Sequence, residues 1–307
     1  MTWSLYRWTW RLESPLYVGM PPAGSVNRCR LYVPARAVWG AISAEIARAK
    51  AATAFPEYDK VGCQVREHVR FTYLFPAEEE DNNKWSAWLP RYVPEEGLVW
   101  EHEGEGAGVQ RLADRRFRAR LVSTRPSTAI GPSSDNAAEG SLRETECINT
   151  RWRDQHGVSG GRVGLVGYVF IHKGLDQELR EHLEQLEAIV VGGDSRYGFG
   201  QLRRVSKNDA TSLFGCRVEL GERDPQVKTE RVLAHAATNC HGRSDLRGEM
   251  EILRGWDYGG HWQVKSPLWV PGSCAQSPQM WRIEHSGRWS GVPEGGWSDC
   301  ADTVCIG

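Results

Sequence analysis

The sequence contains no apolar run of the length that a membrane span needs. Roughly 18 to 20 consecutive apolar residues are required to cross a bilayer as a helix, and no stretch of the 307 residues approaches this length. The first residues, Met1 to Arg7, also lack the basic start, apolar middle and small-residue cleavage site of a signal peptide. We therefore expect a cytoplasmic protein without a membrane partner.

An excess of charge of one sign is also missing. The chain has 38 Lys and Arg against 39 Asp and Glu, a formal net charge of −1. This excludes a histone-like basic protein, so any nucleic-acid surface must be a local patch of cations. At 307 residues the chain exceeds one typical domain, so we expect either one elaborated domain or two.

No CxxC pair occurs among the eight cysteines, which are scattered along the chain. This pattern is typical of reduced thiols that pack as small hydrophobic side chains. A zinc site built from Cys240, His241, Cys300 and Cys305 remains the alternative, although their spacing matches no zinc template. We expect no metal site and no cofactor.

Tryptophan, in contrast, is abundant. The chain has 14 Trp, which we expect to fill cores or subunit contacts, where this residue is enriched. Those outside the obvious periodic segments are Trp85, Trp88, Trp100, Trp152, Trp256, Trp262, Trp269, Trp281, Trp289 and Trp297.

Hydrophobic periodicity places the first elements. Apolar and polar residues alternate over 6–12 and again over 69–75, which predicts two β-strands. Pro34 stands where a helix would begin, and apolar residues then recur at helical spacing, which predicts a helix over about 35–53. Residues 77–110 are acidic and rich in glycine, so we expect an exposed and partly mobile insertion.

Five arginines follow within ten residues and lead into a predicted hairpin. They are Arg111, Arg115, Arg116, Arg118 and Arg120. Residues 121–142 have turn residues at their centre and β-compatible residues on both sides, which predicts a long protruding hairpin. Further along, the pattern predicts a strand over 163–171, a helix over 175–189 and a closing strand over 202–205.

The resulting order, β-α-β-β-α-β, is that of a ferredoxin-like, RRM-like α+β domain. Two helices then cover one face of an antiparallel sheet and leave the other face open, which is a frequent place for RNA. We expect this domain over 1–205, with an insertion at about 77–150. The Trp-rich residues 206–307 have strand candidates at 214–220, 268–270 and 281–283, and they form either a C-terminal extension or a second small β-rich domain.

The segment Val190 to Leu202, VVGGDSRYGFGQL, combines glycines with charge and aromatic rings. Gly192, Gly193, Gly198 and Gly200 allow positive φ and close approach of bare N–H groups to a ligand. Arg196, Tyr197 and Phe199 offer charge and stacking faces, a combination that suits a phosphate backbone carrying bases. The alternative is a glycine-rich turn that only packs.

Three separated segments of the chain match one recurring set of motifs. The first is SPLYVG at 14–19 followed by LYVPARAVWGAI at 31–42, similar to a strand, a loop and the helix start YIPGSSLKGAL. The second, Arg125 to Leu142, is similar to the hairpin RxxIDxxTxxAxEGxL, and the third, Gly192 to Gly200, to a glycine-rich loop before a last strand. Together, over roughly residues 5–205, they resemble the RAMP superfamily of CRISPR effector subunits, RNA-binding proteins built on ferredoxin-like domains.

This resemblance implies that the hairpin presses on a guide RNA and that the glycine segment forms one wall of its groove. We expect the arginines to contact phosphates, Ser127 and Thr128 to bind phosphate or ribose, and Ile130 to wedge between bases. Arg36 replaces a small residue of the motif and is expected to reach phosphate through its side chain. The expected RNA-binding residues are Arg36, Arg115, Arg116, Arg118, Arg120, Arg125, Ser127, Thr128, Ile130, Arg143, Gly192, Gly193, Ser195, Arg196, Tyr197, Gly198, Phe199 and Gly200. The alternative for the arginines is a solvated face that balances the acidic segment.

Nuclease-bearing backbone subunits of this superfamily carry an Asp in the loop between the first strand and the first helix. Here that loop, 20–30, contains no Asp, Glu or His, so metal- or base-assisted attack has no evident agent. We expect no catalytic residue and no enzyme activity. The resemblance then implies the Cas-five family, the non-nuclease subunit that caps the 5′ handle of the guide RNA (crRNA), as in type III-D or type VII-like complexes.

Two alternatives stay open. One is an RNA-cleaving enzyme, either a backbone subunit along the guide or a guide-processing nuclease, with Asp154, His156 and Asp194 as candidate acids or bases. For Asp194 we favour an Asx-type bond that orders the glycine turn. The other is a protein scaffold without RNA contact. The expected partners are guide RNA and other effector subunits, with target RNA as a further candidate, in the cytoplasm of a prokaryotic cell.

Overall fold

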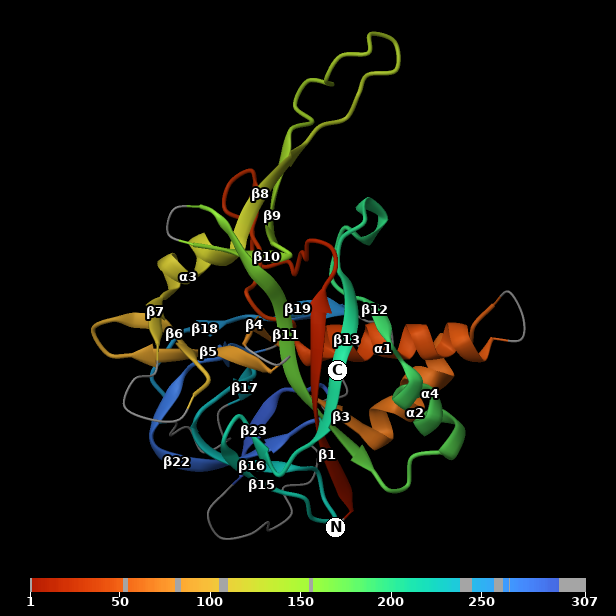
Figure 1. Ribbon diagram of the computed structural model, residues 1–307, viewed down its shortest axis with the longest axis vertical. Coiled ribbons are helices and arrows are strands. Elements are labelled where there is room, and N and C mark those ends of the chain that lie inside the picture. Colours follow the sequence, from red (N-terminus) through yellow and green to blue (C-terminus); the bar gives the residue numbers. More distant parts are fainter. Residues whose placement is uncertain are drawn as a thin grey trace.

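The computed structural model describes residues 2–51, 55–80, 84–104, 110–154, 157–237, 245–256, 262–264 and 266–292. Over these residues the protein is a mixed α+β structure built mostly from strands, with four α-helices (Figure 1). The helices are α1 (Ala35–Lys50), α2 (Tyr58–His68), α3 (Asp114–Leu121) and α4 (Gln177–Gln185), and a 3-10 helix, η2, spans Ser195–Tyr197. None of these helices has the length and apolar character of a membrane span.

The first sheet has ten strands in the order β12-β13-β1-β11-β4-β5-β6-β7, with β3 and β10 also paired to β11. At its centre, β1 pairs antiparallel with β11 and β13, and β11 pairs antiparallel with β3 and β4. The bounds are β1 (Trp3–Leu12), β3 (Val69–Phe71), β4 (Phe75–Glu79), β5 (Trp85–Val93), β6 (Gly97–His102), β7 (Arg111–Ala113), β10 (Arg151–Arg153), β11 (Ser159–His172), β12 (Ala188–Val190) and β13 (Gln201–Asp209). The strands predicted at 6–12, 163–171 and 202–205 are confirmed, whereas the one predicted over 69–75 is divided into β3 and β4.

Both predicted helices exist, with different ends. Helix α1 starts after Pro34, and Val38, Ile42 and Ile46 on one side of it are buried. Helix α4 is capped by Asp176, the residue before its first turn, whose carboxylate accepts a hydrogen bond from the backbone N–H of Leu179 at 3.1 Å. It ends at Gln185, short of the predicted end, because residues 188–190 pair with β13 as strand β12. Helix α2 has a weak sequence signal, since its buried face consists of only three residues.

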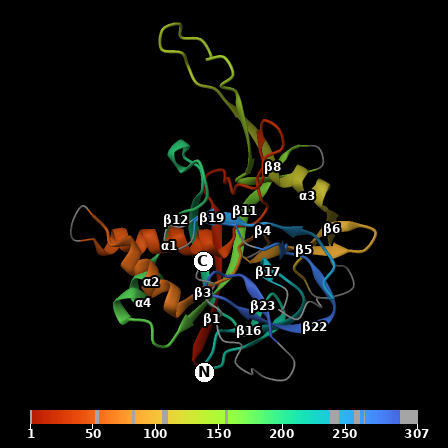
Figure 2. The ribbon, with the colours of Figure 1, turned by 180° about the vertical axis from the view of Figure 1, so that it is seen from behind.

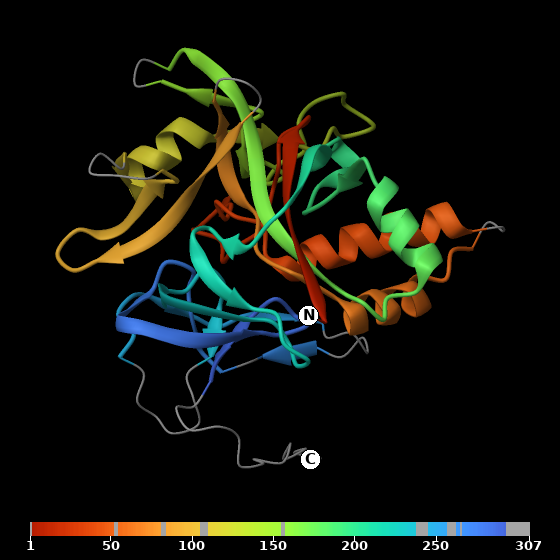
Figure 3. The ribbon, with the colours of Figure 1, turned by 60° about the horizontal axis from the view of Figure 1, so that its bottom comes forward.

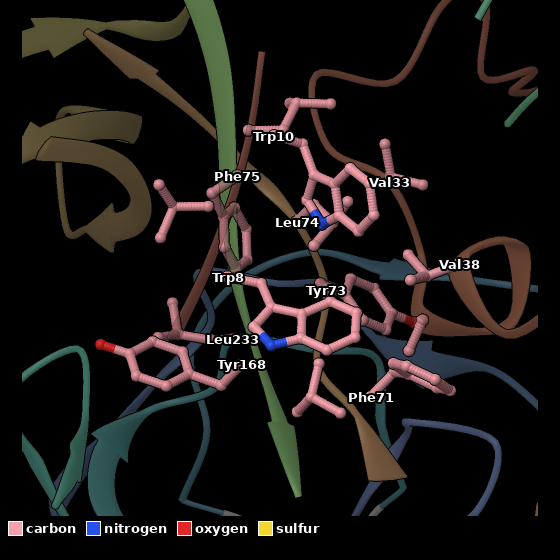
Figure 4. Close-up of a cluster of buried hydrophobic side chains, with 14 of the residues drawn as sticks. Trp8, Trp10, Val33, Val38, Phe71, Tyr73, Leu74, Phe75, Tyr168 and Leu233 are labelled. Atoms are coloured by element: carbon pink, nitrogen blue, oxygen red, sulfur yellow. The ribbon is translucent and has the colours of Figure 1, made fainter. Parts of the chain in front are cut away.

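The two faces of the central strands are both covered. Trp8 and Trp10 of β1 lie on one side, buried beside Val38 of α1 (Figure 4). The prediction that the other face is open is wrong, because Tyr168 of β11 is buried there and its ring meets Phe214 at 4.8 Å between centroids. The described residues therefore leave no open face on these central strands of the kind predicted to accept RNA.

Trp85 and Glu103 help to close that face. The Trp85 ring lies so near β11 that a Cβ added at Gly164 would approach it to 2.3 Å. The guanidinium of Arg7 in β1 makes a 2.7 Å ion pair with Glu103. The prediction of an exposed insertion over 77–110 is thus wrong for most of its length: β4 to β6 belong to the sheet, and the half-buried Glu101 and Glu103 pair with arginines.

The hairpin predicted over 121–142 is confirmed. Strands β8 (Val122–Ser127) and β9 (Arg143–Ile148) pair antiparallel, and the residues between them protrude far from the rest of the chain (Figures 1 and 2). A short strand in the loop before α1, β2 (Val26–Asn27), pairs parallel with β9. The loop is therefore held against the base of the hairpin.

The C-terminal residues form a second sheet, which lies across one end of the first (Figure 3). Its order is β14-β15-β16-β22-β23-β17-β21-β18. Its strands are β14 (Ser212–Leu213), β15 (Cys216–Glu219), β16 (Gln226–Arg231), β17 (Ala236–Ala237), β18 (Met250–Glu251), β21 (Leu268–Trp269), β22 (Cys274–Ile283) and β23 (Trp289–Gly291), and β19 (Arg254–Trp256) and β20 (Trp262–Val264) pair separately. Ion pairs Arg70–Asp224 at 2.8 Å and Arg231–Glu101 at 3.0 Å link the two sheets.

The tryptophans fill the interior, as predicted for one of their two roles. Buried members are Trp3, Trp8, Trp10, Trp85, Trp88, Trp100, Trp152, Trp281 and Trp289. Phe117 of α3 stacks on Trp100 with centroids 4.4 Å apart and also contacts Trp88 and Trp152. The cysteines and histidine of the candidate zinc site lie outside the described residues.

Candidate nucleic-acid interface

The structure brings the base of the hairpin and the glycine segment together. The guanidinium of Arg125 in β8 lies over the ring of Phe199, 5.5 Å from its centroid. Arg143 in β9 lies 3.3 Å from the carboxylate of Asp194 and over the ring of Tyr197, at 5.6 Å. We call the residues Arg125, Arg143, Asp194, Arg196 and Tyr197 the hairpin–glycine surface.

The exposed side chains of this surface are cationic and aromatic. Tyr197 is 72 % exposed, and Arg125, Arg143 and Arg196 are exposed as well. Exposed arginines can donate paired hydrogen bonds to phosphate oxygens, and an exposed tyrosine offers a stacking face to a base. Phe199, in contrast, is 7 % exposed, so the packing role left open for it is the one observed.

Three of the four glycines are explained by contacts within the chain. A Cβ at Gly192 would lie 2.4 Å from the carbonyl oxygen of Tyr17, one at Gly193 would lie 2.9 Å from the Tyr17 ring, and one at Gly200 would lie 2.0 Å from the carbonyl oxygen of Val191. At Gly198, where φ is +81°, a Cβ would meet nothing within 4 Å. Close packing and left-handed backbone therefore account for these residues.

The backbone N–H groups of the segment are also engaged. Those of Gly193, Gly198 and Gly200 donate to the carbonyl oxygens of Tyr17, Ser195 and Pro15 at 2.8, 3.0 and 2.8 Å. These three groups are therefore not directed at a phosphate. Contact with a nucleic acid at this segment would depend on Arg196 and Tyr197 rather than on a backbone cradle.

Asp194 has a different role from the one predicted. It adopts a left-handed conformation with φ of 56°, and its side chain makes no capping bond to the 3-10 helix η2 that follows. Its carboxylate pairs with Arg143 instead. The prediction of an Asx-type bond is therefore wrong, because the carboxylate forms an ion pair with the arginine of the hairpin instead.

The arginine cluster is divided by helix α3 into outward and inward members. Phe117 and Leu121 are buried, so the helix presents Arg115 and Arg116 to solvent on its exposed side. Arg118 and Arg120 are half-buried and contact the protein itself.

The two inward arginines bind groups within the chain. Arg118 pairs with Asp114 and Glu146 at 3.3 and 3.4 Å and donates to the carbonyl oxygen of Cys29 at 3.0 Å. Arg120 pairs with Glu78 at 2.8 Å and lies over the rings of Trp88 and Trp152. These contacts give both arginines a structural role within the fold. The clustering of arginines in the sequence does not distinguish this role from RNA binding.

Other predicted residues lie on the hairpin and on α1. Ser127 donates to the carbonyl oxygen of Arg143 at 3.4 Å, and the hydroxyls of Thr128 and Ser141 are 2.6 Å apart, so both predicted hydroxyls stabilise the hairpin. Ile130 is 59 % exposed near the tip. Arg36 is exposed in the first turn of α1, close in sequence to residues that line a cavity with Gly192 and Ser195.

A buried chain of ionisable groups connects the first sheet to the second. The hydroxyl of Tyr73 lies 2.6 Å from Nδ1 of His235, and Nε2 of His235 bonds to Glu251, which also pairs with Arg30 at 2.6 Å. Burial would raise the pKa of Glu251, but the bonds from His235 and Arg30 outweigh it and lower the pKa to about 2. Although the order tyrosine, histidine, carboxylate could activate a nucleophile, the first two side chains are buried within the fold and offer a substrate no access.

The alternative acids and bases are placed as follows. Asp154 accepts a 2.8 Å hydrogen bond from the backbone N–H of Val158 and so orders a turn, and Asp194 is paired with Arg143. His156 lies outside the described residues.

Sequence reasoning missed Arg28 in the loop before α1, which lines a cavity together with Arg115.

The fold and this surface define a mixed α+β protein with a protruding hairpin and a cationic, aromatic surface at its base. No family model and no curated protein matches the chain. Among solved structures, it is similar to a chain of the type III-B Cmr-beta complex bound to cognate target RNA and AMPPnP, with a TM-score of 0.51 and 11 % identity over 87 % of this chain and 84 % of that one. This likeness shows a shared fold.

Two further similar structures are chains of Cmr-beta, one bound to cognate target RNA and one in the apo state. They have TM-scores of 0.41 and 0.40 and identities of 11 % and 10 %, and they cover 65 % and 66 % of this chain and 96 % of their own length.

Proposed function

We propose that this chain is an RNA-binding subunit of a type III CRISPR ribonucleoprotein effector complex. The observation that carries the proposal is the contact between Arg125 and Arg143 of the hairpin and the rings of Phe199 and Tyr197 in the glycine segment. Two segments more than 50 residues apart in sequence thereby make one surface with cations for phosphates and a ring for a base. The shared fold with a subunit of the RNA-bound Cmr-beta complex supports the same function.

The strand order supports a ferredoxin-like, RRM-like core for this subunit. The order β13-β1-β11-β3, with α1 after β1 and α4 after β11, is the arrangement of a β-α-β-β-α-β fold. Strands β4 to β7, helix α3 and the hairpin are then an elaboration between its second and third strands. The second sheet is a separate β-rich domain in this proposal.

Within such a complex, the proposed role is to cap the 5′ handle of the guide RNA without cleaving RNA, as in the Cas-five family. The loop 20–30 contains no carboxylate or imidazole, and Asp154 and Asp194 are engaged in a turn and an ion pair. Guide RNA and other effector subunits are the proposed partners.

The binding proposal is tested by titrating the purified chain with a labelled single-stranded RNA at several salt concentrations. Replacing Arg125 and Arg196 together by Ala removes two proposed phosphate contacts, so the log–log salt slope should become flatter by about 1.4, at roughly 0.7 per contact. Tyr197→Leu should weaken binding by about 1–3 kcal/mol through loss of stacking, with an unchanged salt slope. Tyr197→Phe should retain the affinity.

Arg217→Ala is the matched control, because Arg217 is an exposed arginine of β15 in the second sheet, far from the hairpin. Its affinity and salt slope should equal those of the unaltered chain. Equal binding by all variants, or no RNA binding by the chain alone and in its assembled complex, would contradict the proposal and favour a protein scaffold.

The proposal of no catalysis has its own test. The assembled complex is incubated with labelled target RNA, and cleavage is followed with and without Asp154→Ala or Asp194→Ala. No cleavage attributable to this chain is expected. Cleavage that one of these substitutions abolishes would show that the chain is a ribonuclease.

A further inference from the structure

A cavity of about 760 Å³ lies where the loop before α1, strands β5 and β6, helix α3 and the second sheet meet. Its volume is in the range of sites that hold small ligands. The cavity is separate from the hairpin–glycine surface, since none of the residues of that surface lines it.

Most charged groups of this cavity are already paired. Arg30 binds Glu251 and the hydroxyl of Tyr32, and Arg118 binds Asp114 at 3.3 Å. Glu96 of the cavity rim is 3.4 Å from Arg111. These pairs fix the walls of the cavity and leave their charges largely neutralised.

Three charged side chains of the lining have no such contact within the described part of the chain. Arg28 comes from the loop before α1 and Arg115 from α3, and Glu249 immediately precedes β18. Arg28 is half-buried, and Arg115 and Glu249 are exposed. The cavity therefore combines two available cations with one available carboxylate.

The rest of the lining is apolar. Met20, Leu98, Met250 and Pro271 contribute to it from four different segments. Apolar side chains of this kind can contact the faces of a planar ring, whereas the charged groups can bind its edge and its substituents. A ligand that fits carries an anion, a planar apolar body and hydrogen-bond donors.

We propose that this cavity binds one nucleotide with an amino-bearing base, its phosphate on Arg28 and Arg115 and its base edge on Glu249. A carboxylate accepts hydrogen bonds only, so it favours guanine, whose edge carries adjacent N–H donors, over uracil, whose single N–H lies between two acceptor oxygens. The inference rests on the proposed RNA-binding function when the nucleotide is a residue of a bound RNA, whose bases can be splayed into pockets.

Free and RNA-borne nucleotides are distinguished by separate titrations. Isothermal titration calorimetry of the full chain with guanosine 5′-monophosphate and uridine 5′-monophosphate measures the affinity of the cavity for free nucleotides. An all-uridine 12-mer RNA and the same RNA with one central guanosine measure binding within a strand. We expect tighter binding of the guanosine ligand in both pairs.

The variants are Arg28→Ala and Glu249→Gln. Arg28→Ala should weaken the binding of both mononucleotides at least tenfold, which is the loss expected when a hydrogen bond to a charged group is removed. Glu249→Gln should remove most of the preference for guanosine over uridine. Arg217→Ala and Glu219→Gln on β15 are the matched controls and should change neither value, and melting temperatures equal to that of the unaltered chain exclude unfolding.

Each outcome separates this inference from the proposed function. Equal binding of the two mononucleotides, unaffected by either cavity variant, overturns the nucleotide site even when RNA binding still depends on Arg125 and Arg196. A guanosine preference that depends on Glu249 in a chain that binds no RNA supports the site as one for a free nucleotide and contradicts the proposed function. A preference seen with both mononucleotides and 12-mers supports a site for an RNA base.

Discussion

The guanidinium of Arg143 lies 3.3 Å from the carboxylate of Asp194, joining the hairpin to the glycine segment. The same guanidinium lies over the ring of Tyr197. Arg143 is 44 % exposed at its side chain, so the pair is screened by solvent and adds little to stability. Its consequence is positional: it holds an exposed cation beside an exposed aromatic ring.

Asp194→Asn should leave the fold intact and increase the positive charge of this surface. The exposed pair is worth about 0–1 kcal/mol, so the free energy of unfolding should change by no more than that. Arg143, released from its partner, gains a phosphate contact, and the salt slope of RNA binding should become steeper by about 0.7. Glu219→Gln in the second sheet is the control; an equal effect of both substitutions on the slope would show a general charge effect.

Gly200→Ala and Gly198→Ala should separate packing from backbone strain. Both positions have φ of +81°, which costs an L-residue roughly 1–2 kcal/mol. At Gly200 the new methyl would also collide with the carbonyl oxygen of Val191 at 2.0 Å, whereas at Gly198 it meets open space. Urea unfolding should therefore show the larger loss for Gly200→Ala, and equal losses would contradict the packing explanation.

Trp100→Ala should show that the segment predicted to be an exposed insertion is part of the core. Trp100 is 1 % exposed, stacks on Phe117 and donates to Asp114 at 2.8 Å. Loss of a buried tryptophan costs about 3–5 kcal/mol, which denaturant unfolding measures directly. Phe55→Ala, at a residue 86 % exposed, is the comparison and should stay within about 0.5 kcal/mol of the unaltered chain.

Acid should destabilise the protein through His235 and Glu251. The carboxylate of Glu251 accepts from Nε2 of His235, so Nδ1 is left to accept from the hydroxyl of Tyr73. Burial lowers the pKa of His235 below its ordinary value, so the unfolded chain takes up a proton first and stability falls as pH drops below about 6.5.

The contribution of Glu251, whose pKa is about 2 in the fold, is complete above its ordinary pKa near 4.5 and is lost as the pH falls from there toward 2. Melting temperatures should therefore drop between pH 7 and pH 5 and again below pH 4.5. His235→Gln, which removes the titrating ring, should flatten the first drop, and a profile of unchanged steepness would contradict this assignment. Glu251→Gln removes the charged partner of the half-buried Arg30, which keeps its bonds to Tyr32 and Gly19, and should lower the free energy of unfolding at pH 7 by about 1.5–3 kcal/mol.

Much of the central fold could be predicted from local patterns. Strand β1 and helix α1 show periods of two and 3.6 in their own residues, and β11 is a continuous apolar run of the kind that a strand buried on both faces has. Strand β5 has no such alternation, since six successive residues from Trp85 to Pro90 are buried on both faces. The acidic connections around it then suggest an exposed segment, which is why its place in the sheet could not be predicted.

The candidate site was predictable in its segments but not in the roles of its residues. The hairpin and the glycine segment have turn chemistry that can be recognised in one dimension. Which arginines face solvent cannot be recognised there: Arg115 and Arg116 point outward, whereas Arg118 and Arg120 bind acidic groups from β9 and β4. No sequence pattern indicated that Arg28 lines a cavity, because its neighbours in the cavity come from distant parts of the chain.

The sequence by itself determined the elements whose cause is local: the central strands, helices α1 and α4, the protruding hairpin, and the absence of a carboxylate or imidazole from the loop 20–30. Only the tertiary structure decided that the second sheet face is covered, that three glycines serve packing, and that Arg143 meets Asp194 and Tyr197. The physical reason is that burial, ion pairing and cavity formation depend on groups far apart in sequence. A local sequence pattern cannot predict which of these groups come into contact.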